Sequence, residues 1–180
     1  VADKKFYVDA YSSRFVVSVS TPTRVDDGVT HEVVCVFQST GITLYFDGAH
    51  IKTISASMPA VGNHTVYIGR HAGLVDYTHF KGTIDEIRLW NRTRTAEEIQ
   101  GTANKHLVGN ELGLVGLYRL DEGSGNIAYD SSPNANHGTI YGATWVPGLV
   151  DLHLPGETTI SATLCGSSSL STRSDRIRAL

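Results

Sequence analysis

The chain has 180 residues, of which 41% are hydrophobic and 18% are charged. The 15 basic and 18 acidic side chains leave a formal net charge of -3, so the chain lacks the positive field that attracts a polyanion. We therefore expect no nucleic-acid partner. No stretch approaches the ~20 apolar residues of a membrane-spanning helix, so we expect no membrane insertion. The length suits one domain with a buried core and a tail.

Hydrophobic residues recur with a period of two through the first half of the chain, which is typical of strands with one buried face. In the stretch FVVSVST, for example, Phe15, Val17 and Val19 share a face. The short connections STG and DG contain glycine, which favours hairpins. We expect an antiparallel meander with strands at residues 5–11, 15–21, 31–38, 42–48, 50–57, 64–69 and 84–90.

The alternating pattern breaks once, at a short helical stretch. Thr95 and Glu98 form a capping-box pattern ahead of AEEIQGTA, which predicts a helix that ends near Gly101. Strands are expected again at residues 114–121, 137–142 and 158–164. Many short strands, 18 glycines and one helix predict an all-β protein, a two-sheet antiparallel sandwich or jelly roll.

The last residues, 165–180, are rich in serine and arginine and have little to bury. We expect a tail that is mobile or that a partner orders. The two cysteines, Cys35 and Cys165, lack metal-ligand spacing, and we expect buried thiols rather than a single bridge. The eight histidines match no catalytic or metal-binding motif and are expected on the surface or in loops.

Asp85 lies in a predicted strand at a position where a core residue is expected. Regular alternation places its side chain on the face of Ile87 and Leu89. A buried carboxylate needs a cation, an arginine or several hydrogen-bond donors, because an unpaired buried charge costs several kcal/mol. We therefore expect Asp85 to be nearly inaccessible and to contact a metal or at least two donors.

Three blocks, HEVVCVFQSTGITLYFDGAHIKTI, YIGR and FKGTIDEIRLWNRTRTAEEIQ, resemble the ordered blocks of laminin-G-like, concanavalin A-like jelly rolls related to pentraxins. They span residues 31–100. The resemblance implies the jelly-roll fold that the strand pattern also predicts.

The segment at 113–148 resembles the part of such domains that usually comes first, and 150–164 resembles the strand that follows it. The halves would then be in permuted order; alternatively, some members of the family carry a similar stretch after the helix. We expect a single domain over residues 1–164, with 113–164 completing the sandwich within the chain or by strand exchange.

The family resemblance also implies a structural calcium held by Asp85 and backbone carbonyls. The loop YDSSPNANHG offers further oxygen ligands, and the predicted metal residues are Asp85, Asp130, Asn134 and Asn136, with Asp130 as the second carboxylate. The alternative needs no metal: Asp85 accepts backbone N–H groups or pairs with an arginine, and Asp130 closes an Asx turn.

Two functions follow from the resemblance. The first is a non-catalytic, extracellular carbohydrate-binding or adhesion module, in which outward tyrosines contact a glycan; the candidates are Tyr7, Tyr11, Tyr45 and Tyr67. The second is a structural assembly subunit of a surface layer, sheath or virion coat, which contacts coat proteins or pairs with copies of itself through edge strands. Glucanases of this superfold carry E-x-D-x-x-E on one strand, and this pattern is absent, so we expect no enzyme.

Overall fold

The computed structural model describes residues 5, 7–12, 15–25, 27–57, 65–69, 80–103, 105–146, 159–166 and 177–179. Within these residues the protein is built from strands in three sheets and one short helix, which confirms the all-β sandwich fold. Among them, no helix has both the length and the apolar character needed to cross a membrane.

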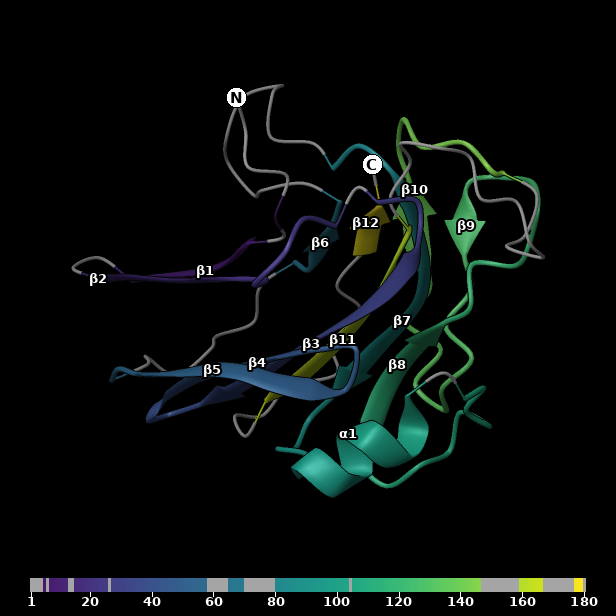
Figure 1. The fold of residues 1–180 in the computed structure, drawn as a ribbon. Helices are drawn as coiled ribbons and strands as arrows, with labels where there is room; N and C mark the ends of the chain where they lie inside the picture. The colour runs from purple at the N-terminus through teal and green to yellow at the C-terminus, as the bar shows by residue number, and fades with distance from the viewer. Residues whose placement is uncertain are drawn as a thin grey trace.

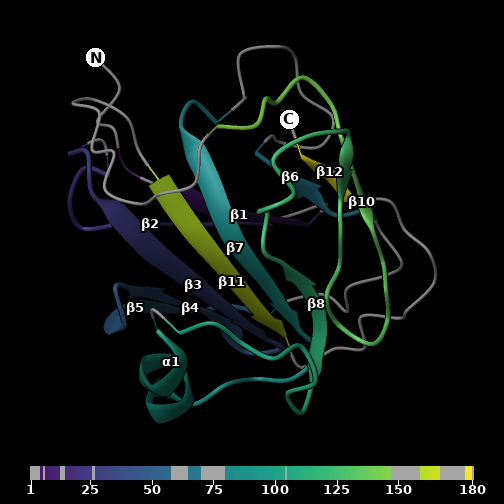
Figure 2. The same cartoon turned by 90° about the vertical axis from the view of Figure 1, so that its right-hand side faces the viewer.

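The largest sheet has six strands in the order β5-β4-β3-β11-β7-β8. The strands are β3 (Thr30–Gln38), β4 (Gly41–Phe46), β5 (Ala49–Ser55), β7 (Thr83–Trp90), β8 (Leu114–Tyr118) and β11 (Thr159–Gly166). The hairpins β3–β4 and β4–β5 are antiparallel, as the meander predicts. The pair β7–β8, whose second strand follows the helix, is also antiparallel. Strand β11 lies between β3 and β7 and runs parallel to both, which the hairpin pattern does not predict (Figure 2).

A second layer lies against one face of this sheet (Figure 1). It contains the hairpin of β1 (Tyr7–Ser12) and β2 (Phe15–Ser20) and a four-stranded sheet in the order β6-β12-β10-β9. The strands of the smaller sheet are β6 (Tyr67–Ile68), β9 (Ile127–Ala128), β10 (Gly138–Ile140) and β12 (Ile177–Ala179). Strand β12 falls within the predicted tail and pairs in parallel with β10 and β6.

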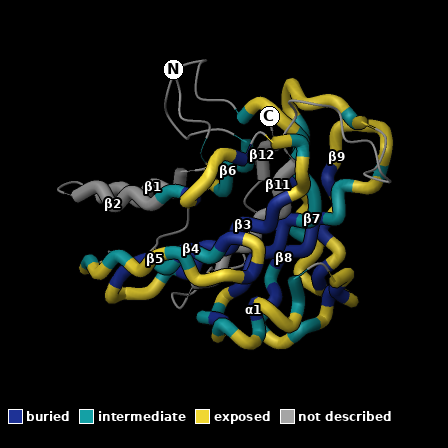
Figure 3. Tube along the Cα trace, in the orientation of Figure 1, coloured by how far each residue is buried: buried dark blue, intermediate teal, exposed yellow. Residues whose placement is uncertain are grey.

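The core between the layers consists of two clusters of buried side chains. One is centred on Ile42 and Leu44 of β4, and the other on Ile87 of β7 and Tyr118 of β8. Figure 3 shows the buried residues concentrated in β3, β7 and β8. Burying each large apolar side chain contributes about 1.5–3 kcal/mol, so these clusters hold the two layers together.

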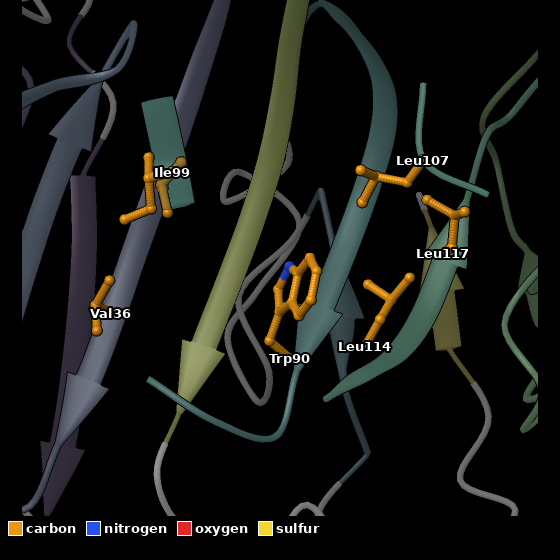
Figure 4. Packing of buried hydrophobic residues seen from close by; sticks show 7 residues of the cluster. Val36, Trp90, Ile99, Leu107, Leu114 and Leu117 are labelled. Atoms are coloured by element: carbon orange, nitrogen blue, oxygen red, sulfur yellow. The ribbon is translucent and has the colours of Figure 1, made fainter. Parts of the chain in front are cut away.

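The opposite face of the large sheet is covered by α1 (Ala96–Thr102) and the segment after it. Ile99 and Leu107 pack there against Trp90 and Leu117 (Figure 4). The capping box predicted from the sequence is confirmed, because the Thr95 hydroxyl accepts the Glu98 N–H and the Glu98 carboxylate accepts the Thr95 N–H.

The segment 113–164 contributes β8 and β11 to the same sheet as β3 and β7. This is the pairing that a single shared sandwich requires. The boundary of the domain at residue 164 remains a prediction, and residues 167–176 and 180 of the predicted tail lie outside the described part of the chain.

Candidate functional site

The alternation of β7 is interrupted at Glu86, and this changes the face on which Asp85 lies. Glu86 has a φ of 48°, and the register with β11 shifts by one residue after Asp85. This is a β-bulge, in which two residues stand opposite one. Asp85 pairs with Ser161 and Arg88 with Thr163, so Asp85 lies on the face of Arg88. The expectation that Asp85 shares a face with Ile87 and Leu89 is therefore wrong.

Asp85 is half-buried rather than nearly inaccessible. Its Oδ1 accepts the backbone N–H of Glu86 at 3.0 Å, and that is the single donor the described residues supply. Burial raises the pKa of Asp85; the Glu86 hydrogen bond opposes this, and the Glu86 and Asp121 charges add to it. Asp85 thus follows the metal-free alternative, as an acceptor of a backbone N–H.

Asp130 has a different environment, in which four donors converge on one buried carboxylate. Oδ1 accepts the N–H groups of Leu117 and Ser132, each at 2.8 Å. Oδ2 accepts the Ser132 hydroxyl at 2.9 Å and the Asn136 N–H at 2.9 Å. The bond to Ser132, two residues on, is the predicted Asx turn. Asp130 is 5% exposed, so its buried carboxylate holds the loop that follows it by hydrogen bonds to Ser132 and Asn136.

These residues do not fit a shared calcium ion. Tyr118 of β8 pairs with Ile87 on one side and bridges to Asp130 on the other, and residues directly opposite each other share a face of a sheet. Asp130 therefore lies on the face of Ile87, whereas Asp85 lies on the face of Arg88, so the two side chains start from opposite faces of the sheet. The donors around Asp130 also point hydrogen atoms to where a cation would lie.

The two asparagines predicted as ligands make their described contacts through N–H groups and a backbone carbonyl. Asn134 is exposed and donates its side-chain N–H to the carbonyl of Val115 at 3.0 Å. Asn136 contacts Asp130 through its backbone N–H, and its carbonyl accepts the Tyr118 hydroxyl. Both residues therefore act in the hydrogen bonding of the loop.

The outward face of β9 and β10 carries a row of side chains above the Asp130 loop. Ala128, Gly138 and Ile140 face inward: the first two are buried and Ile140 packs against the core. Their neighbours in sequence therefore point outward. We call this row the aromatic strip; its residues are Ile127, Tyr129, His137, Thr139 and Tyr141.

The strip is exposed and extended. Tyr129 is 52%, Ile127 40% and Tyr141 39% exposed, which is high for apolar and aromatic side chains. Thr139 pairs with Ile127 across the two strands, and Gly138 pairs with Ala128 next to them. From His137 to Tyr141 the strand spans about 13 Å, since each residue adds about 3.3 Å.

Contacts at both ends hold the strip in place. At one end, the rings of Tyr129 and His137 meet edge to face with centroids 5.0 Å apart. The backbone N–H of Tyr129 donates to Glu122 at 2.7 Å. At the other end, the indole N–H of Trp145 donates to the Gly125 carbonyl at 2.8 Å. The strip is therefore a preorganised surface rather than a set of independent side chains.

The tyrosines selected from the sequence lie elsewhere. Tyr45 is half-buried and packs against the cluster under α1, and Tyr67 is half-buried on β6. The side chains of Tyr7 and Tyr11 lie outside the described residues. The signal for the strip was present in NIAYD, where Ile127 and Tyr129 alternate with Ala128, but this stretch is too short to predict a strand.

His31 contradicts the expectation that the histidines lie on the surface or in loops. It lies in β3 and is 8% exposed. Its Nδ1 contacts Asp47 at 2.8 Å and its Nε2 contacts Asp27 at 3.1 Å. Burial lowers the pKa of His31, but the hydrogen bonds and charges of Asp47 and Asp27 together outweigh burial and raise it. The prediction of a buried cysteine is confirmed for Cys35, which is 2% exposed, while the side chain of Cys165 lies outside the described residues.

Comparison with known families identifies the class of protein. The model of the concanavalin A-like lectin/glucanases superfamily matches residues 2–100. The match spans more than half of the chain and ends within α1, and the chain belongs to this superfamily. No curated protein and no solved structure matched the chain. The aromatic strip lies beyond the matched residues.

Proposed function

We propose that the protein is a non-catalytic carbohydrate-binding or adhesion module that binds a glycan on the aromatic strip. The superfamily fits a module of this kind. The observation that carries the proposal is the exposure of Tyr129 and Tyr141 on one strand pair, with Ile127 between them. We place the module outside the cell or on a cell or virion surface, where glycans are accessible.

The chemistry of the strip suits a neutral sugar. One face of a pyranose ring presents C–H groups, which pack on the face of an aromatic ring, while hydroxyl groups around its edge need hydrogen-bond partners. The hydroxyl groups of Tyr129 and Thr139 and the imidazole of His137 supply such partners. A length of about 13 Å matches two or three sugar units, since one unit adds about as much length as one to two strand residues.

Two features support binding without hydrolysis. Glycoside hydrolysis needs two carboxylic acids on opposite sides of a glycosidic bond. Near the strip, the carboxylate of Asp130 is buried and accepts four hydrogen bonds, and Glu122 accepts the N–H of Tyr129. Both carboxylates are therefore engaged in holding the backbone.

A glycan array probed with the whole chain tests the proposal, followed by titration of the best ligand against variants. We expect Tyr129→Ala and Tyr141→Ala each to weaken binding about five- to tenfold, because each removes a stacking surface worth roughly 1–1.5 kcal/mol. Tyr45→Phe is the matched control, since Tyr45 is half-buried beside His50 on the far side of the large sheet. Equal losses in the control, or a chain that binds no glycan, would reject the proposal.

One observation favours the alternative, a structural assembly subunit. Strand β11 fills the centre of the large sheet, parallel to both neighbours. A strand in this position can be supplied by a neighbouring copy, because β3 and β7 would offer the same backbone groups to a strand from another chain as they offer to β11. Mass measurement in solution separates the two: a monomer that binds glycans supports the module, and a ring or polymer without glycan binding supports assembly.

A further inference from the structure

The position of the proton on His137 follows from its contacts. The backbone N–H of Asp130 donates to Nδ1 of His137 at 3.1 Å. A neutral imidazole has one acceptor nitrogen and one N–H, so a ring that accepts through Nδ1 carries its hydrogen on Nε2. His137 is therefore held in the tautomer whose Nε2–H is a donor.

The bond that selects this tautomer is itself fixed by the fold. Asp130 is anchored by its bridge to Tyr118 and by the four donors on its carboxylate, which orient its backbone N–H. The backbone N–H of His137 donates to the Ala135 carbonyl at 3.0 Å. The backbone and the ring of His137 are thus both constrained before any ligand arrives.

The Nε2–H of His137 is available to a ligand. His137 is an exposed residue, and among the described residues no protein acceptor contacts its Nε2. The planes of the His137 and Tyr129 rings meet at 73°, so a flat ligand resting on one ring turns its edge towards the other. In a pyranoside, that edge carries the ring oxygen and the hydroxyl oxygens.

We propose that His137 is the specificity-determining hydrogen-bond donor of the aromatic strip, and that its Nε2–H binds an acceptor oxygen of a neutral pyranoside stacked beside it. This inference rests on the proposed glycan-binding function and assigns a defined role within that site. A site that aims a donor at a substrate oxygen discriminates strongly against analogues that lack the oxygen, because the donor that the bound ligand covers is then unpaired. Tyr129 supplies the stacking surface, and His137 selects the sugar.

Two variants separate the ligand contact from the structural bond. In His137→Asn, the side-chain oxygen takes the position of Nδ1 and can still accept the backbone N–H of Asp130. The Nε2–H donor that faces the ligand is lost. In His137→Gln, the longer side chain places its amide N–H at the position of Nε2, so a donor still faces the ligand. The hydrogen bond that the backbone N–H of Asp130 donates to Nδ1 is lost. We expect His137→Asn to unfold at the wild-type temperature and to bind at least tenfold more weakly. We expect His137→Gln to unfold at a lower temperature and to bind within about threefold of wild type.

The probes are maltotriose, cellotriose and β1,4-galactotriose, titrated into the whole chain, and the tightest binder is used for the variants. If Tyr129→Ala loses binding but His137→Asn does not, the proposed function stands and the role of His137 is wrong. If none of the three sugars binds, both the role of His137 and the assignment of a neutral glycan as the ligand are wrong.

Nitrogen NMR of the imidazole gives a readout that does not depend on a ligand. In the wild-type spectrum, the neutral imidazole should show a protonated Nε2 and an unprotonated Nδ1. A spectrum of the opposite tautomer would overturn the proposal even if glycans bind, because the outward nitrogen would then be an acceptor.

Discussion

The carboxylate of Asp130 accepts the backbone N–H of Leu117 at 2.8 Å, and Leu117 is fully buried in the cluster beneath α1. A loop residue is thereby joined to the edge strand of the large sheet. The N–H of Ser131 also donates to the Leu117 carbonyl at 2.7 Å. The loop beneath the aromatic strip is therefore attached to the sheet by both backbone groups of one residue.

Replacing Asp130 by asparagine should destabilise the protein strongly. The asparagine side chain has almost the same shape as aspartate, but its NH2 group would replace one carboxylate oxygen. The donors that bind this oxygen in the wild type would then face another donor. Leaving buried donors unsatisfied costs about 1–3 kcal/mol each, so we expect a loss of about 2–4 kcal/mol in the free energy of unfolding. Urea denaturation measures this. The control is Asp121→Asn at an exposed site, and similar midpoints for both variants would contradict the role given to Asp130.

Calcium should leave the stability of the protein unchanged. A ligand that binds only the folded state raises the melting temperature with its concentration, and chelation reverses this. The donors around Asp130 and the placement of Asp85 and Asp130 on opposite faces of the sheet oppose a shared ion, so we expect equal melting temperatures with millimolar calcium and with a chelator. A drop on chelation that Asp130→Asn abolishes would show that the loop rearranges to bind the metal.

The contribution of His31 to stability should decrease as the pH rises. Its folded pKa lies above the ordinary value of 6.5, so the folded state holds the proton more tightly than the unfolded state. The stabilisation is complete below about pH 6.5 and is lost as the pH rises through the folded pKa. The groups that face the ring are Asp47 and Asp27.

The measurement is the difference in unfolding free energy between wild type and His31→Gln at a series of pH values. Taking the difference cancels groups that titrate equally in both proteins. We expect a larger difference at about pH 6 than at about pH 9. A difference that is constant, or that grows with pH, would show that the imidazole is neutral between the two aspartates.

A proline in β11 should disrupt the large sheet. Thr163 stands opposite Val34 of β3 and Arg88 of β7, and proline removes the backbone N–H from the centre of this pairing. We expect Thr163→Pro to lose about 3 kcal/mol or more, or to fail to fold. Thr144→Pro, at an exposed position outside the strands, is the control. An unchanged denaturation midpoint for Thr163→Pro would mean that residues 5–90 form their core without β11.

The elements that the sequence predicts well are those defined by nearby residues. The hairpin from β3 to β4 follows from alternation and a short glycine-containing turn, and the helix follows from Thr95 and Glu98. In these cases all the interactions that define the element lie within a few residues. The superfamily fold could be recognised for the same reason, because its blocks are local stretches in a fixed order.

The features that the sequence does not predict depend on distant partners. The bulge at Glu86 exists only relative to β11, so no pattern within β7 could place Asp85 on the face of Arg88. The sequence likewise shows oxygen-bearing residues around Asp130. It does not show that N–H and O–H donors already bind both carboxylate oxygens of Asp130. The aromatic strip depends on the pairing of β9 with β10, two strands that are short and joined by an irregular loop.

The most direct test of glycan binding on the aromatic strip is an amide NMR titration of the whole chain with the best glycan from the array. We predict that the largest chemical-shift changes fall on Ile127, Tyr129 and residues 137–141, with small changes on β4 and β5. Changes centred on Tyr45 and His50, or the absence of any saturable change, would contradict the assignment of the binding site to this surface.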